Sequence, residues 1–262
     1  MSPWLNNLLT PACDVLISSH ELALLQAGKR LASVPVAPEK NGEALNSRVT
    51  QAIRDLVNAA PYKNTRHTNV WLSHSLATHA VVRLDIRAMK PAEILTTLKA
   101  YWEDALGTPA STLAVTSQLQ SDGLSVLSSC CATDLLAAIQ SALRGANWTT
   151  KNVAPHIAKI WNASRKQIGP RNCCMLVLQD KVLSIGLQHN KQWAAWTSEG
   201  CESHEWSELA NRVARFCRST GLIDSQSIPV WVHSSQTTGT PNFIGLDNWA
   251  LLNTAQQTGL SA

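Results

Sequence analysis

Residues 13–25 of the chain are CDVLISSHELALL, two short apolar runs on either side of the polar turn Ser18-Ser19-His20. This pattern is typical of two antiparallel strands joined by a tight connection. A third apolar run, residues 30–36, follows and ends at Pro35 and Pro38, because proline cannot continue a strand ladder. The stretch therefore predicts three consecutive antiparallel strands.

A helix and a further strand complete this unit, and the same order of elements returns later in the chain. Residues 43–59 place apolar side chains at helical spacing, and residues 69–72 form the next strand candidate. The second copy spans residues 173–233, with three strand candidates, a helix and a strand. The repeat is one of pattern and not of residue identity. The sequence thus predicts a doubled βββαβ unit.

The segment between the two copies predicts an inserted α/β subdomain. It offers a strand at residues 80–84, a helix at 91–106, a hairpin around Ser121-Asp122-Gly123 and a helix at about 133–143. A further helix at residues 155–164 opens the second cycle. We therefore expect four parts: a first half at 10–75, the insert with its connecting helix at 76–150, a second half at 151–235, and a polar, partly ordered tail at 236–262.

Composition narrows the class of protein. The 262 residues are 45% hydrophobic and 15% charged, with a net charge of +4 and no run of Lys or Arg, so a nucleic-acid partner is not expected. No apolar run is long enough for a membrane span, so direct membrane insertion is not expected either. The seven cysteines are odd in number, include two adjacent pairs and fit no disulfide framework. These features predict a soluble intracellular protein with reduced thiols.

No catalytic motif or complete metal-ligand set occurs in the sequence. Three groups of residues could form chemical centres, but a structural role is the better interpretation of each: Cys201 and His204 with His189 as a zinc site; His67, His74 and His79 as acid–base groups; Asp14, Asp85 and Asp180 as a two-metal site. We therefore predict no catalytic residue, no metal and no cofactor.

Several stretches resemble a known family. They are Val70-Trp71-Leu72-Ser73, Val81-Val82-Arg83-Leu84, Leu113-Ala114-Val115-Thr116, residues 135–143 and Asn152-Val153-Ala154-Pro155. Together with the order of elements over residues 12–233, they resemble the bacterial actin-like proteins of type IV pilus and type II secretion platforms, the PilM family and the cytoplasmic part of GspL. The resemblance implies an α/β, actin-like ATPase fold of two ribonuclease-H-like halves with an inserted subdomain.

The chain departs from the nucleotide-binding members of that fold at both phosphate turns. Those members have a turn of the type Asp-x-Gly-[Ser/Thr], where glycine lets backbone N–H groups approach phosphate. Here the first turn is Ser18-Ser19-His20 and the second is Gln179-Asp180-Lys181, with no glycine in either. We therefore expect a degenerate nucleotide site and no enzyme activity. Asp14 and Asp180 keep the alternative of an ATP-binding protein open, since carboxylates hold Mg²⁺.

The resemblance also implies a role and a partner. Proteins of this kind act as non-catalytic scaffolds that bind the cytoplasmic segment of a single-span membrane protein, which recruits them to the inner face of the cytoplasmic membrane. Self-association into a homo-oligomer stays open. Trp193 and Trp196 lie three apart in one predicted strand, hence on opposite faces. Both are buried if the strand is covered on both faces, whereas one of them points outward if it is covered on one side only. We expect that exposed tryptophan to contact the partner.

Overall fold

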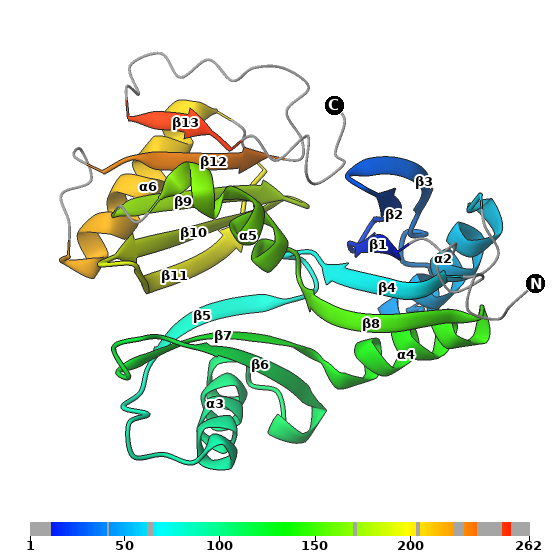
Figure 1. The fold of residues 1–262 in the computed structure, drawn as a ribbon, viewed down its shortest axis with the longest axis horizontal. Coiled ribbons are helices and arrows are strands. Elements are labelled where there is room, and N and C mark those ends of the chain that lie inside the picture. The colour runs from blue at the N-terminus through cyan, green and yellow to red at the C-terminus, as the bar shows by residue number, and fades with distance from the viewer. Residues whose placement is uncertain are drawn as a thin grey trace, which may run out of the picture. The chain divides into compact units, whose positions relative to one another are not determined.

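The computed structural model describes residues 12–40, 42–61, 65–169, 172–202, 205–222, 228–234 and 248–252. Two five-stranded sheets and one three-stranded sheet, each with its helices, make up this part of the chain (Figure 1). In chain order the elements are β1 (Ala12–Ile17), β2 (Glu21–Gln26), β3 (Lys29–Pro35), α2 (Leu45–Ala59), β4 (Thr65–Leu72), β5 (Thr78–Arg83), α3 (Pro91–Leu106), the 3-10 turn η1 (Ala110–Thr112), β6 (Leu113–Leu119), β7 (Ser125–Ala132), α4 (Thr133–Gly145), β8 (Trp148–Pro155), α5 (His156–Ile168), β9 (Cys173–Gln179), β10 (Val182–His189), β11 (Gln192–Gly200), α6 (Trp206–Thr220), β12 (Val230–Ser234) and β13 (Trp249–Leu251).

The two five-stranded sheets share one topology. Their strand orders are β3-β2-β1-β4-β8 and β11-β10-β9-β12-β13. In each sheet the first three strands run antiparallel to their neighbours, and the strand after the helix pairs parallel with the first. The predicted doubled unit is therefore confirmed, and each copy carries a fifth strand, β8 or β13, that the sequence pattern did not predict.

Apolar faces explain why the helices form where they do. Helix α2 buries Val49, Ala52, Ile53 and Leu56, and α4 buries Leu135, Ile139 and Leu143 at the same helical spacing. In the other five-stranded sheet, every residue of β9 is buried, as expected of a strand covered on both faces. Helix α6 covers one face through Leu209, Val213 and Cys217.

The inserted elements form the three-stranded sheet β5-β7-β6, with α3 packed on one face. Helix α3 has the limits predicted from the sequence. Pro91 begins it, the Glu93 side chain accepts a hydrogen bond from the Lys90 N–H at 2.8 Å, and Gly107 ends it at a φ of 61°. Its buried Ile94, Leu98 and Trp102 form the core of the insert with Val126 and Cys130.

The described residues separate into two compact units. One comprises those of Met1–Leu76 and Ala132–Ala163, and the other comprises those of Ala77–Cys131 and Ser164–Asn253. Compactness does not by itself define independently folding domains, so the domain boundaries at residues 75, 150 and 235 stay predictions. Of the predicted tail at 236–262, all but residues 248–252 lies outside the described residues.

All seven cysteines are free thiols, as predicted from their spacing. The sulfur atoms of Cys174 and Cys217 lie 3.9 Å apart in the core beneath α6. Across the part of the chain that the structure describes, no helix is long and apolar enough to cross a membrane.

Candidate functional site

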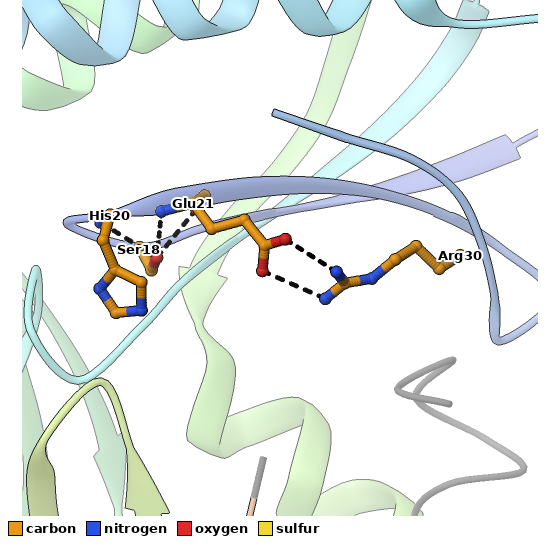
Figure 2. A network of polar contacts seen from close by, with 4 residues as sticks. All are labelled: Ser18, His20, Glu21 and Arg30. Atoms are coloured by element: carbon orange, nitrogen blue, oxygen red, sulfur yellow. Dashed lines mark hydrogen bonds and ion pairs between the residues drawn. The ribbon is translucent and has the colours of Figure 1, made fainter. Parts of the chain in front are cut away.

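Ser18 fills the turn between β1 and β2 with its own side chain (Figure 2). Its hydroxyl oxygen accepts hydrogen bonds from the N–H groups of Glu21 at 2.8 Å and His20 at 3.3 Å, and its O–H donates to the Glu21 carbonyl at 2.8 Å. Serine favours this arrangement because its short hydroxyl reaches backbone groups two or three residues further along. The turn is thus occupied by a side chain.

The remaining backbone donors of the turn are also paired. The Ser18 N–H donates to the Glu21 carbonyl at 2.9 Å, and the Ser19 N–H donates to the Ser75 hydroxyl at 3.2 Å. Hence the N–H groups of four consecutive residues, 18–21, each have a partner. A phosphate is held by backbone N–H groups that point at it without another acceptor. Binding here would require breaking these bonds first.

Glu21 connects this turn to the neighbouring strand. Its carboxylate forms two parallel hydrogen bonds, at 2.8 and 3.2 Å, with the guanidinium group of Arg30 on β3 (Figure 2). About a third of each side chain is exposed, so the pair adds little to stability. Its two-point geometry nevertheless fixes β2 against β3 beside the turn.

Asp14, the carboxylate that the sequence offered for Mg²⁺, is engaged by a lysine. Its oxygens accept hydrogen bonds from the Lys159 ammonium group at 2.9 Å and from the Asn69 amide at 3.0 Å. Burial by itself would raise the pKa of Asp14, but these bonds and the lysine charge outweigh it, so the pKa is lowered. Lys159 also lies 5.7 Å from the centre of the Trp71 ring. The carboxylate is therefore ionised, and its negative charge is already balanced by the Lys159 ammonium group.

The second turn, between β9 and β10, is as short as a hairpin connection can be. Gln179 pairs with Val182, which leaves Asp180 and Lys181 as the only connecting residues. Both have positive φ, 56° and 58°, the conformation of a type I′ turn. Glycine and asparagine are the usual residues there, so lysine is accommodated at some cost. The Lys181 carbonyl accepts a hydrogen bond from the Cys201 N–H at 2.7 Å.

These residues do not fit a Mg²⁺-nucleotide. A phosphate loop needs unpaired backbone donors and room for the anion, whereas the first turn is filled by Ser18 and the second has only two residues. A carboxylate that holds a hydrated cation must face that cation, whereas Asp14 faces Lys159. Lys159 is the residue that the sequence analysis missed, because nothing in the sequence links positions 145 residues apart.

The prediction that Trp193 and Trp196 lie on opposite faces of their strand is wrong. The two rings pack edge to face, with their centres 5.2 Å apart, and both are buried at 4% and 9% exposure. The reason is a β-bulge: Trp193 pairs with Gln188 and Ala195 pairs with Leu187, so Ala194 is an extra residue. One inserted residue restores both tryptophans to the same side of the sheet.

Strand β5 of the insert covers that side of β11. The His79 ring lies edge to face with Trp196 at 5.9 Å, and the N–H of Trp193 donates to the Gln120 side chain at 3.4 Å. Partner binding by Trp193 or Trp196 stays untested as a prediction, but neither side chain is exposed for it.

The other residues considered as acid–base groups or metal ligands make contacts typical of a structural role. Asp85 pairs with Arg87 two residues on, which lowers the pKa of Asp85 to about 2. His79 is buried, with its Nδ1 atom 2.8 Å from the Ser129 hydroxyl. His204 lies outside the described residues. Among the residues that are described, no three His, Cys, Asp or Glu side chains gather in a group that could hold a metal ion.

Similarity to known proteins is found at the level of structure. No protein-family model and no curated protein matches the sequence. In structure the chain is similar to a chain of the PilM–PilN type IV pilus biogenesis complex, with 14% identity over 86% of this chain and 81% of that one, at a TM-score of 0.58. It is also similar to the cytoplasmic domain of EpsL, an inner-membrane component of the type II secretion system of Vibrio cholerae, with 13% identity over 93% and 86% of the two chains, at 0.54.

A third similar structure is a Bacteroides thetaiotaomicron protein of unknown function with an actin-like ATPase fold, with 9% identity over 100% and 99% of the two chains, at a TM-score of 0.58. The chain therefore has an actin-like ATPase fold, and the predicted fold class is confirmed. Within that class it shares its fold with PilM-complex and EpsL structures, as the sequence resemblance predicted. At identities this low the likeness concerns the fold alone.

Proposed function

We propose that this chain is a non-catalytic scaffold of a bacterial pilus or secretion platform, and that it binds the cytoplasmic segment of an inner-membrane protein. The observation that carries the proposal is the first turn, where Ser18 and Ser75 take up the backbone N–H groups that a phosphate would need. An actin-like fold whose turn cannot hold a phosphate still presents its outer surfaces, and these can bind another protein.

Similarity in fold supports the choice of system. One similar structure is a complex named for type IV pilus biogenesis, and another is the cytoplasmic domain of an inner-membrane secretion component. The proposal places this chain on the cytoplasmic face of the membrane, held there by a partner with a single membrane-spanning segment. The competing proposal is an ATP-binding protein, and nucleotide titration separates the two.

Isothermal titration of the chain with Mg-ATP is expected to give no heat above dilution up to about 1 mM, where binding is worth only about 4 kcal/mol. The reason is that the donors of the first turn are paired and Asp14 is neutralised by Lys159. Circular dichroism before and after the titration controls for folded protein. A micromolar dissociation constant that Asp14→Ala abolishes would contradict this and restore the ATP-binding alternative.

Membrane recruitment tests the scaffold role. In the native cell, the tagged chain is expected to sediment with membranes and to be cross-linked to a protein with one membrane-spanning segment. In a strain lacking the pilus or secretion platform, it is expected to move to the supernatant. If the chain stays in the supernatant even when every platform component is present, the proposed function is wrong.

A further inference from the structure

Strand β8 forms one edge of its sheet. Its inner side pairs in parallel with β4, and no described strand pairs with its outer side (Figure 1). Such an edge presents a row of backbone N–H and C=O groups at the spacing of another strand. An extended peptide can add to an edge of this kind, with its backbone giving affinity and its side chains giving specificity.

A groove of about 570 Å³ lies beside this edge. Gln140 and Arg144 in the last two turns of α4, with Asn147 two residues beyond the helix, form one wall, and β8 forms the other wall from Trp148 to Val153. Trp148 is buried and anchors the strand, whereas Thr149, Lys151 and Asn152 are exposed. The strand edge therefore has a side-chain site directly next to its backbone.

The positive charge of this groove indicates what kind of peptide it can bind. Arg144 and Lys151 are both exposed, and neither forms an ion pair with any described residue. None of the described residues that line the groove is Asp or Glu. The other lining side chains, such as Gln140 and Asn152, are neutral hydrogen-bonding groups. Two cations that pair with no described residue, beside backbone groups that pair with no described strand, favour a strand that carries Asp or Glu, because opposite charges on adjacent strands attract.

The same lysine disfavours a second copy of this chain. A cationic side chain on an edge strand prevents self-pairing, because like charges meet across the new ladder. A nucleic acid is also a poorer fit, since it would not use the backbone groups and no described lining residue offers an exposed aromatic ring for stacking. The chemistry that fits is an acidic, extended peptide.

We propose that the β8 edge, with Arg144 and Lys151, is the docking site for an acidic extended segment of the partner. The inference rests on the proposed function, since it names the surface and the chemistry by which the membrane protein's cytoplasmic segment is held. The segment adds as a further strand beside β8, and its carboxylates lie against the two cations.

Fluorescence polarisation with the full chain tests the charge requirement. The probe is a labelled eight-residue peptide that alternates glutamate and valine, matching the eight residues of β8. It is expected to bind, and the same peptide with lysine for glutamate is not. The Arg144→Glu/Lys151→Glu variant is expected to bind the glutamate peptide at least tenfold more weakly and to gain binding of the lysine peptide. Absence of binding by the wild-type chain would overturn the inference.

A matched variant separates the site from overall charge. Arg165→Glu/Lys166→Glu makes the same change of net charge at two exposed residues of α5, outside the groove. It is expected to bind the glutamate peptide within twofold of wild type. Equal weakening in both variants would mean that net charge alone holds the peptide, and the proposed site would be wrong.

Two N-methylated probes test the backbone pairing. Alternate residues of an added strand point their N–H groups toward β8, so methylating one alternate set should abolish binding and methylating the other should not. If both methylated peptides bind like the parent, the edge is not used. A single-stranded oligonucleotide that displaced the parent peptide at equal concentration would identify a general anion site and would also overturn the inference.

The membrane experiment keeps this inference distinct from the proposed function. If wild type and Arg144→Glu/Lys151→Glu are both cross-linked to the membrane partner, the scaffold role stands and the β8 site fails. If the chain binds the glutamate peptide at β8 but never sediments with membranes, the docking site stands and the scaffold role fails. Loss of cross-linking only in the groove variant supports both.

Discussion

Gly186→Ala is expected to lower the free energy of unfolding by about 3 kcal/mol, at the upper end of the usual cost of overpacking. A Cβ atom at this position on β10 would overlap the six-membered ring of Trp196, lying 2.5 Å from its Cε3 atom, and would be 2.8 Å from Cζ3 of Trp193. Both rings are buried and packed against each other, and Trp196 also packs against His79, so neither can move aside cheaply. Urea unfolding followed by circular dichroism measures the change.

Gly200→Ala is the matched control. It lies on the neighbouring strand β11, has nothing within 4 Å of the added Cβ, and its φ is not in the left-handed region. Its stability is expected to stay the same or rise slightly, because alanine restricts the unfolded chain more than glycine does. In Gly186→Ala/Trp196→Leu the smaller side chain should recover part of the loss. A Gly186→Ala variant within 0.5 kcal/mol of wild type, about the experimental error of additivity tests, would contradict the packing argument.

The sequence predicted the elements that carry a strong local pattern. Helix α3 has both of its predicted limits, because Pro91 and Gly107 mark them and the apolar residues between recur at helical spacing. The three strands β9, β10 and β11 were predicted from apolar runs separated by turns at Gln179-Asp180-Lys181 and His189-Asn190-Lys191. In the structure each turn is one residue shorter, Asp180-Lys181 and Asn190-Lys191, and all four residues have positive φ. In these segments local preference and tertiary packing agree.

Strand β8 escaped prediction because an edge strand needs few apolar residues. Its sequence, WTTKNVAP, has four polar residues in succession, and most of its side chains are not fully buried. The two threonines were the available signal, since β-branched residues favour strands. The bulge at Ala194 had no such signal, because neither glycine nor proline marks it. That single residue reversed the predicted direction of one tryptophan and with it the predicted exposed partner contact.

The candidate site also has one part that the sequence predicted and one part that it did not. The lack of glycine in both phosphate turns is a property of the sequence, and from it the expectation of a degenerate site follows. The partner of the Ser19 N–H in the first turn is Ser75, and the partner of Asp14 is Lys159, each far along the chain. Long-range pairs of this kind depend on topology, and one sequence carries no direct signal for them.

His79 gives the second large expected effect, a loss of stability in acid. Burial lowers the pKa of this imidazole from its usual 6.5 to about 4, so the folded protein keeps it neutral where the unfolded chain binds a proton. A histidine whose pKa is lowered by folding costs stability below the unfolded pKa, and the loss grows as pH falls from 6.5 to about 4. At 1.36 kcal/mol per pH unit, the full loss is about 3 kcal/mol.

Urea unfolding of wild type and His79→Gln at pH 7, 6, 5 and 4 isolates this effect, because all other titrating groups are common to both proteins. Glutamine keeps a polar group near Ser129, which lies 2.8 Å from the imidazole, but takes up no proton. The stability of wild type is expected to fall by about 3 kcal/mol more than that of the variant between pH 7 and pH 4. Curves that run parallel over this range would show that His79 is not held neutral.

If the variant does not fold, the wild-type protein provides the same test. The imidazole of His79 packs edge to face on Trp196 at 5.9 Å, so the ring current of the indole shifts its NMR signals away from those of exposed histidines. Those signals are expected to show no titration between pH 7 and pH 5. Strand β5 contacts β11 at this ring, so protonation of His79 below pH 5 should loosen the insert before it affects the core around β9. As the pH is lowered, amide hydrogen exchange should therefore accelerate in β5 before it accelerates in β9. If exchange accelerates in β5 and β9 at the same pH, the contact between His79 and Trp196 does not open before the core around β9.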